Sequence, residues 1–427
     1  MKRTIDVYVM DASHFVGRIV FDDSRPNASQ FAYHEDWLNS PQAFELSPDL
    51  PLGYGWAYLS NQDRQSPFPL AIADTEPDAW GRTVIRRAFR KSSVALKKKL
   101  SELDYLLGVD DFSRIGAIRL TEGGSLSFDA QEDRRRTPTL LDLSKIYDAS
   151  RRLELNEETI DDLRYLEGKG TSLGGARPKC SVLNADGHLA LGKFPSAADQ
   201  RSVAKGEILG LELAKAAGIR AASGRVHSID GVDFAVIDRF DRAAGDDVRI
   251  PYMSLSSFMQ HADRAYPPPT YLDFFERLSL DSADSWEANA EEMLRRLFLN
   301  ILISNTDDHG RNTGLLLSNR GTWELSPAFD INPEPRWRRD SPYCSKLFLD
   351  DGGPIESVRQ IWEARDDFGL SKANAAKILQ EVVQSVKSWR TIAAGPAVRM
   401  TPNDLKAFAP AFEHVHLEEA ERILSAC

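Results

Sequence analysis

The sequence predicts an α+β protein of several domains, with strands in its N-terminal half and mainly helices in its C-terminal half. Two observations lead to this fold class. Short apolar segments separated by turn residues recur before residue 240. Beyond residue 250, apolar residues recur mostly at helical spacing. The 427 residues are enough for two or three domains, and the hydrophobic (42%) and charged (27%) contents are ordinary for a globular chain.

Composition excludes several classes of protein. The net charge of -11 argues against this chain wrapping nucleic acid by itself, because phosphate contacts require clustered Lys and Arg. The three cysteines are scattered and odd in number, so we expect neither a disulfide framework nor a zinc site. No apolar run approaches the roughly 20 residues that span a bilayer, and the N-terminus lacks the apolar core of a signal peptide. We therefore expect a cytoplasmic protein without membrane contact.

Residues 1–145 are predicted to form an N-terminal mixed α/β subdomain without catalytic spacing. Residues 40–70 are rich in Pro, Gly and Ser and are expected to be irregular. The expected elements are a hairpin over 5–9 and 16–21, helices from 77 through 89 and over 96–107, and a strand over 115–120.

Residues 146–248 are predicted to form a strand-rich lobe with a Gly-rich loop. A helical stretch, 140–167, precedes Gly174-Gly175, and a hairpin with an Asp186-Gly187 turn follows. Paired glycines let the backbone approach a phosphate closely, although most such loops are simple turns. Lys193 lies on the second strand of the hairpin, as either a phosphate-pairing lysine or an exposed strand lysine.

Glu207 lies in a helix expected over residues 202–217. It shares an apolar stripe with Val203, Leu211 and Ala214. A buried carboxylate needs a partner, and Lys193 is the natural one. The alternative is that Glu207 lies at the edge of the stripe and reaches water.

Residues 249–427 are predicted to form a mainly helical lobe. A buried strand over 234–237 ends at Asp238, before this lobe begins. The expected helices cover 270–279, 285–304, 354–365, 371–390 and 402–425.

A polar loop, residues 305–312, lies between a core helix and the apolar run 315–317. Asp307, Asn312 and the later Asp330 supply what phosphoryl transfer requires, namely one Asp that orients the attacking hydroxyl and two oxygen ligands for magnesium. Two alternatives stay open. Asp and Asn are ordinary turn residues, and His309 with Asp307 and Asp308 could form a metal-hydrolase cluster.

The order of these parts is that of a protein kinase: Gly-rich loop, strand lysine, helix glutamate, hinge strand, Asp-x-x-x-x-Asn loop, strand and Asp. The predicted fold is therefore α+β with a two-lobed protein-kinase-like plan, an N-terminal mixed subdomain and a helical C-terminal lobe. The usual His-Arg-Asp and Asp-Phe-Gly signatures are absent from the sequence.

Three segments, 171–179, 305–312 and 325–332, resemble the HipA-like serine/threonine kinases, which are the toxins of HipA–HipB toxin–antitoxin modules. The resemblance covers nearly the whole chain. It implies ATP and Mg²⁺ as cofactors, Asp307 as catalytic base, Asn312 and Asp330 as magnesium ligands, and Ser172 as an autophosphorylated serine. The residues it implies for ATP binding are Gly174, Gly175, Ala176, Arg177, Pro178, Lys179, Lys193, Glu207, Asp238, Arg239, Phe240, His309, Arg311, Phe329 and Ile331.

The resemblance also implies partners. These are a small HipB-like helix-turn-helix antitoxin that carries the main DNA contact, and a translation component, such as an aminoacyl-tRNA synthetase, as substrate. Two other functions are weighed against this one: a small-molecule kinase of the aminoglycoside-phosphotransferase type, and a non-catalytic co-repressor that acts with a DNA-binding partner.

Overall fold

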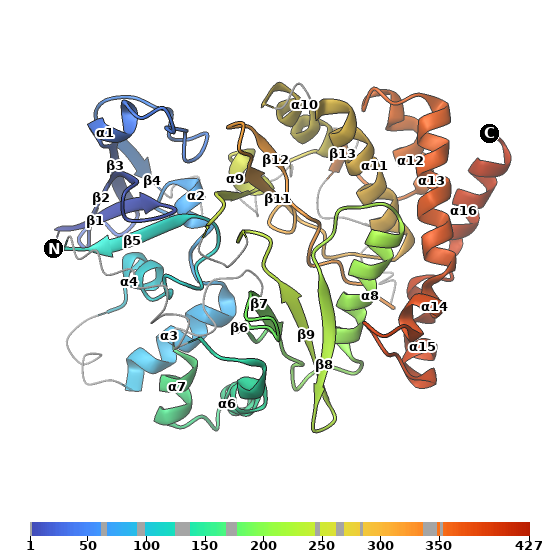
Figure 1. Cartoon of the computed structure of the whole chain (residues 1–427), viewed down its shortest axis with the longest axis horizontal. Coiled ribbons are helices and arrows are strands. Elements are labelled where there is room, and N and C mark those ends of the chain that lie inside the picture. The colour runs from blue at the N-terminus through green and yellow to red at the C-terminus, as the bar shows by residue number, and fades with distance from the viewer. Residues whose placement is uncertain are drawn as a thin grey trace. The chain divides into compact units, whose positions relative to one another are not determined.

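The computed structural model describes residues 2–60, 66–91, 99–123, 137–167, 177–243, 248–261, 269–281, 285–335, 348–350 and 353–427. Ser172, Gly174, Gly175 and Ala176, which the sequence placed in the predicted phosphate loop, lie outside these residues. The chain divides into two compact units, each made of two segments (Figure 1). The first comprises Met1–Ala198 and Asp238–Ala262, and the second comprises Asp199–Ile237 and Asp263–Cys427.

The first unit contains an antiparallel five-stranded sheet. Ile5 and Val7 alternate with polar neighbours and are fully buried, as are Ile19 and Phe21 on the adjacent strand. This alternation confirms the expected opening hairpin. One strand lies in the region expected to be irregular. In spatial order the strands are β4 (Ala57–Ser60), β3 (Ala28–Tyr33), β2 (Phe15–Asp22), β1 (Lys2–Val9) and β5 (Ile118–Glu122).

Helices of the first unit begin and end at clear local signals. The stretch 140–167 is mostly helical, as expected. Asn156 has a left-handed backbone (φ 60°) that ends one helix, and a capping box of Thr159 and Asp162 starts the next. The elements of this unit outside the five-stranded sheet are α1 (Glu35–Leu38), α2 (Leu70–Ala73), α3 (Ala79–Lys91), α4 (Glu102–Leu107), α6 (Leu143–Leu155), α7 (Ile160–Leu166), the hairpin of β6 (Lys179–Leu183) and β7 (Leu189–Lys193), β10 (Tyr252–Ser254) and α9 (Leu255–Phe258).

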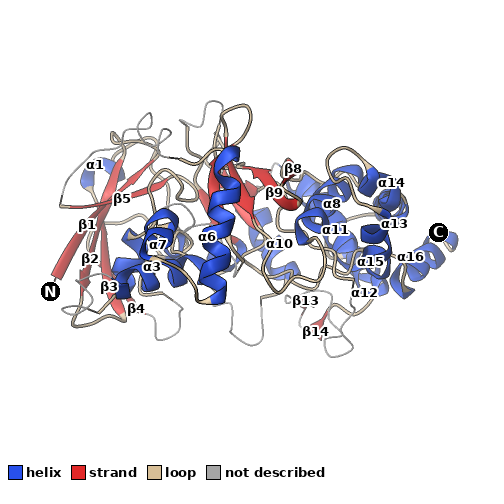
Figure 2. Cartoon of the chain, turned by 90° about the horizontal axis from the view of Figure 1, so that it is seen from below, coloured by secondary structure: helices blue, strands red, loops and turns tan. Residues whose placement is uncertain are grey.

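The second unit is mainly helical, as Figure 2 shows for the elements from α10 to α16. Its first segment holds α8 (Val203–Ala216) and the hairpin of β8 (Gly224–Ile229) and β9 (Val232–Asp238, whose last residue already belongs to the first unit). The second segment holds α10 (Tyr271–Asp281), α11 (Trp286–Leu302), β11 (Gly314–Leu317), β12 (Trp323–Leu325), β13 (Phe348–Asp350), β14 (Gly353–Pro354), α12 (Val358–Glu363), α13 (Lys372–Lys387), α14 (Trp389–Ala394), α15 (Pro402–Phe408) and α16 (Val415–Ser425).

Three expected helices of the second unit are shorter than predicted. The segment expected as a helix from residue 354 starts with a short strand, and its helix begins only after the capping box at Ser357. The predicted helix 371–390 ends at Lys387, and Ser388 separates it from α14. The predicted helix 402–425 divides into α15 and α16, with Pro410 in the short turn between them.

Within the part of the chain that the structure describes, no helix combines the length and apolar character required to cross a membrane.

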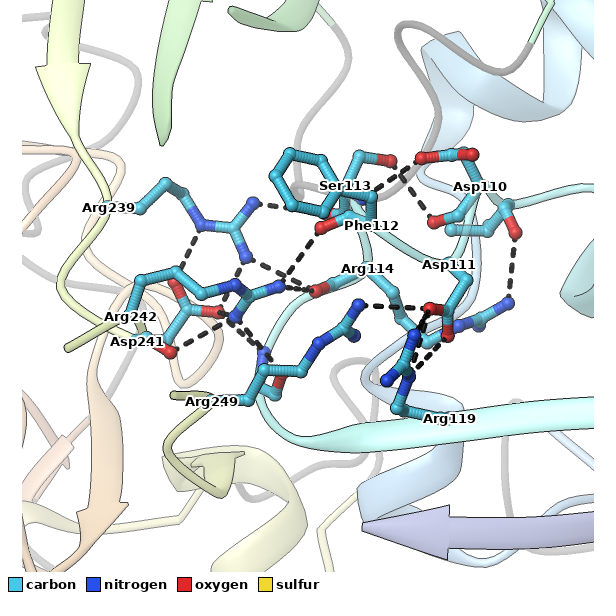
Figure 3. A network of polar contacts seen from close by, with 12 residues as sticks. Asp110, Asp111, Phe112, Ser113, Arg114, Arg119, Arg239, Asp241, Arg242 and Arg249 are labelled. Carbon is cyan, nitrogen blue, oxygen red and sulfur yellow. Dashed lines mark hydrogen bonds and ion pairs between the residues drawn. The ribbon is translucent and has the colours of Figure 1, made fainter. Parts of the chain in front are cut away.

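A buried charged network ties the segment after β9 to the loop before β5 within the first unit (Figure 3). Asp241, only 1% exposed, accepts hydrogen bonds from Arg239 Nε (2.6 Å) and Arg242 Nη1 (2.7 Å). It also accepts one from the backbone N–H of Gly116 (2.6 Å). Burial alone would raise the pKa of the Asp241 carboxyl, but the charges and hydrogen bonds of the two arginines hold its pKa well below the ordinary value.

Asp241→Asn is expected to destabilise the first unit strongly at neutral pH, because it leaves two buried guanidinium groups without their counter-ion. Breaking such a pair costs about 3–5 kcal/mol, which corresponds to a melting temperature lower by roughly 10 °C. The folded pKa of Asp241 lies below its unfolded value of about 3.9. The stabilisation is therefore complete above about pH 4 and is lost as the pH falls through the folded pKa.

Thermal unfolding of wild type and variant between pH 7 and pH 3 tests this expectation. The gap in melting temperature should be constant down to about pH 4 and shrink below it. Asp161→Asn is the control, because the Asp161 side chain is 85% exposed. A gap no larger than that of the control contradicts the assignment of Asp241 as the central counter-ion.

Candidate functional site

The polar loop of residues 305–312 starts from an unusual helix end in the second unit. The apolar face of α11, including Leu294, Phe298 and Ile301, is fully buried and fixes the helix in the core. Ser304 then takes a left-handed conformation (φ 56°). The N–H of Asn305 donates to Asn300 O (2.8 Å) and that of Ser304 to Ile301 O (3.3 Å), which is the Schellman pattern of a helix C-terminus.

Ser304 is unusual at this position, because a side chain makes the left-handed conformation costly. The residue is completely buried, and its Oγ lies 3.3 Å from Ala411 O and 3.2 Å from His414 Nε2. These contacts offset part of the cost of the turn. The turn sends the chain sharply away from α11 and into the loop.

The loop is held closed by its own hydrogen bonds. The N–H of Asn312 donates to His309 O (2.8 Å), and Asn312 Nδ2 donates to Asp307 O (3.0 Å). Asp307 is exposed, whereas Asp308 is buried and accepts a very short hydrogen bond from the Tyr271 hydroxyl. Asp307 and Asp308 therefore lie in different environments, and the side chain of Asp307 is accessible to solvent.

Asp330 also has a left-handed backbone (φ 55°). Asn332 Nδ2 donates to its Oδ1 (3.0 Å) and lies 3.3 Å from its carbonyl oxygen. The preceding residues are anchored by a parallel bridge in which Ala328 N–H donates to Arg220 O (2.6 Å) and Ala222 N–H donates to Ala328 O (2.9 Å). The carboxylate of Asp330 is thus presented by a strained but firmly attached segment.

Helix α8 packs directly on this segment. A Cβ placed at Gly210 would overlap the carbonyl oxygen of Ile331, so only glycine allows the two backbones to approach so closely. On its other sides α8 contacts α13 and α14. The position of Ile331, and with it that of Asp330, is therefore set by α8.

Asn312 and Asp330 line one pocket with an empty volume of about 440 Å³, including space open to solvent. Two further predicted ATP-binding residues, Phe329 and Ile331, line it as well. Oxygen donors of the carboxylate and amide type fit the preference of Mg²⁺. The remaining lining residues are Ile219, Tyr271, Met293, Arg296, Leu299, Asn300, Asn305, Asp308, Thr313 and Ala328.

The pocket is also lined by polar side chains that were not predicted as site residues. Asn305 Oδ1 is buried there and has no hydrogen-bond partner among the described residues. This amide oxygen is therefore available in the same pocket to accept a hydrogen bond or to coordinate a cation. Arg296 also lines the pocket, and it donates hydrogen bonds to Glu292 Oε1 (2.6 Å) and to Ser326 O (2.7 Å). Burial lowers the pKa of Arg296, and the charge of Glu292 opposes that shift. Tyr271 precedes the loop by more than thirty residues, and no local pattern marks it.

The other predicted site residues are distributed as follows. His309 is half-buried and Arg311 exposed, both in the loop. Glu207 is 2% exposed on α8, which agrees with its place in an apolar stripe. Lys193 belongs to the first unit and Glu207 to the second, so their pairing stays a prediction.

In the first unit, Arg177 is exposed and Pro178 is buried, and both precede β6. Lys179 is the first residue of that strand and 3% exposed. Asp238 is the last residue of β9, Arg239 and Phe240 follow it, and all three are half-buried. Among the described residues there is no group of three or more His, Cys, Asp and Glu side chains arranged to hold a metal ion, and the alternative cluster of His309, Asp307 and Asp308 is not found as such a group.

Comparison with known proteins relates the whole chain to one family. A model of the HipA-like C-terminal domain matches residues 171–390, and a model of the HipA N-terminal domain matches residues 5–121. A protein of Sinorhizobium fredii named "Putative kinase Y4mE" is 28% identical over 338 residues, covering 74% of this chain and 75% of that protein.

Among solved structures, HipA of the Shewanella oneidensis MR-1 HipA–HipB–operator DNA complex matches with a TM-score of 0.64 and 18% identity, covering 99% of this chain and 96% of HipA. The two chains share a fold, and the expected α+β, two-lobed kinase-like fold class is confirmed. The proinflammatory kinase CtkA of Helicobacter pylori has a TM-score of 0.43 at 12% identity, covering 58% of this chain and 94% of CtkA.

Gly210→Ala is expected to destabilise the second unit, although Gly→Ala inside a helix ordinarily stabilises by about 1 kcal/mol. The clash with the Ile331 carbonyl should cost about 1–3 kcal/mol. It should also speed amide hydrogen exchange in the peptide 325–332, because the segment that carries Asp330 must move.

Gly206→Ala on the same helix is the matched control, since its Cβ would meet only the ring of Phe408, at 2.9 Å. Thermal unfolding and exchange mass spectrometry compare the two variants. Equal exchange of the peptide 325–332 in both variants would show that α8 does not position Asp330 through Gly210.

Proposed function

The chain belongs to the HipA-like family, because the model of its C-terminal domain matches residues 171–390, more than half of the 427 residues; from this premise we propose that it is an ATP- and Mg²⁺-dependent protein serine/threonine kinase. One observation carries the proposal beyond the family. Asn312 and Asp330 line one pocket, and Asn312 is tied by a hydrogen bond to the backbone of Asp307 on the same loop.

The proposed roles follow from the environment of each residue. Asp307 is exposed and can meet the hydroxyl of a protein substrate, orient it and accept its proton. Asn312 and Asp330 would hold Mg²⁺, which neutralises charge on the transferred phosphate when bound. Nδ2 of Asn312 is engaged with Asp307 O, so the amide oxygen is the atom suited to the cation. Lys193 would pair with the phosphates of ATP, supported by Glu207.

The sequence relative named as a kinase supports phosphoryl transfer. The fold shared with a HipA that was solved together with HipB and operator DNA supports a role as the toxin of a toxin–antitoxin module. We place the main DNA contact on a HipB-like antitoxin, in agreement with the net charge of -11 on this chain. As substrate we propose a translation component of the aminoacyl-tRNA synthetase class, and as location the cytoplasm.

Asp307→Asn is expected to lower phosphate transfer by about 10²–10⁴-fold, because it removes the group that accepts the hydroxyl proton. Wild type and variant are incubated with ATP, Mg²⁺ and a cell lysate, and phosphorylated proteins are identified by mass spectrometry. Asp307 is exposed, so the variant should fold normally. Asp366→Asn, at a side chain 71% exposed, is the control that should keep full activity.

Three results would change the proposal. Full activity of Asp307→Asn removes this residue from catalysis. Transfer to small alcohols such as aminoglycosides but to no protein favours the small-molecule kinase. No transfer by wild type, together with intact repression in the presence of an antitoxin, favours the non-catalytic co-repressor.

We further propose that phosphorylation of Ser172 switches the kinase off. A phosphate adds about -1.5 to -2 charge at neutral pH next to Gly174 and Gly175, where it would oppose the phosphates of ATP. Wild type preincubated with ATP should gain one phosphate and lose ATP affinity in calorimetry, while Ser172→Ala treated in the same way keeps it. Normal ATP affinity of the protein phosphorylated at Ser172 contradicts the switch.

A further inference from the structure

The first unit contains two buried polar links between the region matched by the HipA N-terminal domain and segments that contain predicted ATP-binding residues. One link joins Asp78 to Lys179, and the other joins the loop 112–116 to residues 239–242. We infer that the N-terminal domain is a positioning element of the nucleotide site, with Asp78 and Arg242 as its positioning residues. This inference rests on the proposed kinase function.

The first link is an ion pair sealed from solvent. Lys179 Nζ lies 2.8 Å from Asp78 Oδ2, and the two side chains are only 3% and 5% exposed. The second oxygen of Asp78 accepts a hydrogen bond from the backbone N–H of Gly81 (2.7 Å), so the same carboxylate caps the start of α3. Both ends of the link are therefore fixed, one by a helix and the other by the first residue of β6.

Lys179 requires this counter-ion because of its neighbour across the hairpin. Lys179 lies directly opposite Lys193 in the antiparallel pair of β6 and β7. Side chains of opposed residues point to the same face, and like charges in that position repel each other. Asp78 neutralises Lys179, and Lys193 is the lysine of this pair that the proposed function assigns to the phosphates. Lys179 is thus engaged at the end of the Gly-rich segment in a contact that the sequence did not predict.

The second link holds the segment that contains the predicted ATP-binding residues Arg239 and Phe240. Figure 3 shows the guanidinium groups of Arg239 and Arg242 directed at the loop before β5. Arg242 Nη2 donates to Phe112 O (3.1 Å) and Arg114 O (2.7 Å), and its Nη1 donates to Gly116 O (3.1 Å). Arg239 Nη1 donates to Ser113 O (2.9 Å).

Gly116 lets the same loop pack closely against β10. Gly116 has a φ of +70°, and a Cβ there would lie 3.0 Å from the Cβ of Tyr252. The loop itself is anchored in the N-terminal domain by the buried side chain of Arg114, which donates to Thr75 Oγ1 (3.0 Å) and Leu106 O (3.0 Å). Residues 239–242 are therefore attached to the core of that domain and not only to β9.

The two links lead to a specific expectation for catalysis. Substitution of a residue that only stabilises the fold lowers the amount of active enzyme. Substitution of a residue that positions a binding site lowers the affinity of that site for its ligand. Loss of either link should therefore raise the KM for ATP and the Kd of ATP, while kcat at saturating ATP changes little.

The test compares three variants of the full chain. Asp78→Asn removes the charge at Lys179 but keeps an oxygen for Gly81, so the cap of α3 survives. Arg242→Gln weakens the second link separately. Arg82→Gln is the matched control, because Arg82 lies on α3, pairs with Glu76 (2.6 Å) and Glu102 (2.8 Å) and donates to Pro77 O (3.3 Å), but among the described residues it contacts neither Lys179 nor residues 239–242.

ATP affinity is measured by calorimetry, and kcat and KM are measured by phosphate transfer, well below the melting temperature of each variant. We expect Asp78→Asn and Arg242→Gln to weaken ATP binding about tenfold each, with kcat within about twofold. Arg82→Gln should lower the melting temperature but leave ATP affinity unchanged.

Unchanged or tighter ATP binding in both link variants overturns the inference and leaves the proposed kinase intact. Equal weakening in Arg82→Gln also overturns it, because the effect would then follow general stability. If wild type binds no ATP, the proposed function fails first, and the inference fails with it.

Discussion

The close approach of α8 to the backbone of Ile331 is the constraint on which the geometry of the site depends. A side chain at position 210 would push the two backbones apart, because its Cβ would overlap the carbonyl oxygen of Ile331. Helix α8 also packs against α13 and α14, and these contacts oppose its movement away from the segment that carries Asp330. Lys205, near the start of the same helix, is 9% exposed and pairs with Asp404 (2.9 Å) and Asp233 (3.2 Å). A helix fixed on three sides is a rigid support for the segment that carries the proposed magnesium ligand.

Much of the fold follows from local patterns in the sequence. The alternation of Ile5 and Val7 predicted the opening hairpin, and the spacing of apolar residues along α11 predicted the helix that leads into the polar loop. The misplaced boundaries have local causes as well. Asn156 and the capping boxes at Thr159 and Ser357 end or start helices at positions where apolar periodicity continues. Capping interactions set such helix boundaries, and apolar periodicity alone does not predict them.

The candidate site was predictable only in part. The spacing of Asp307 and Asn312 identified two residues of one loop, because a short loop keeps sequence neighbours close together. The later Asp330 lines the same pocket as Asn312. Tyr271, Asn300 and Arg296 could not be found in this way, since tertiary packing brings them to the pocket. The same holds for the bond between Asp78 and Lys179, whose partners are 101 residues apart. Gly210 looks like an ordinary small residue of a helix until its neighbour is known.

The left-handed backbone of Asp330 lowers the free energy of unfolding of the chain. Glycine or asparagine adopts this conformation at lower cost than aspartate, and a side chain held there costs on the order of 1–3 kcal/mol. The hydrogen bond from Asn332 Nδ2 to Asp330 Oδ1 (3.0 Å) offsets part of this cost. The proposed magnesium ligand would therefore be held in a fixed direction at some expense of folding stability, as is common at functional sites.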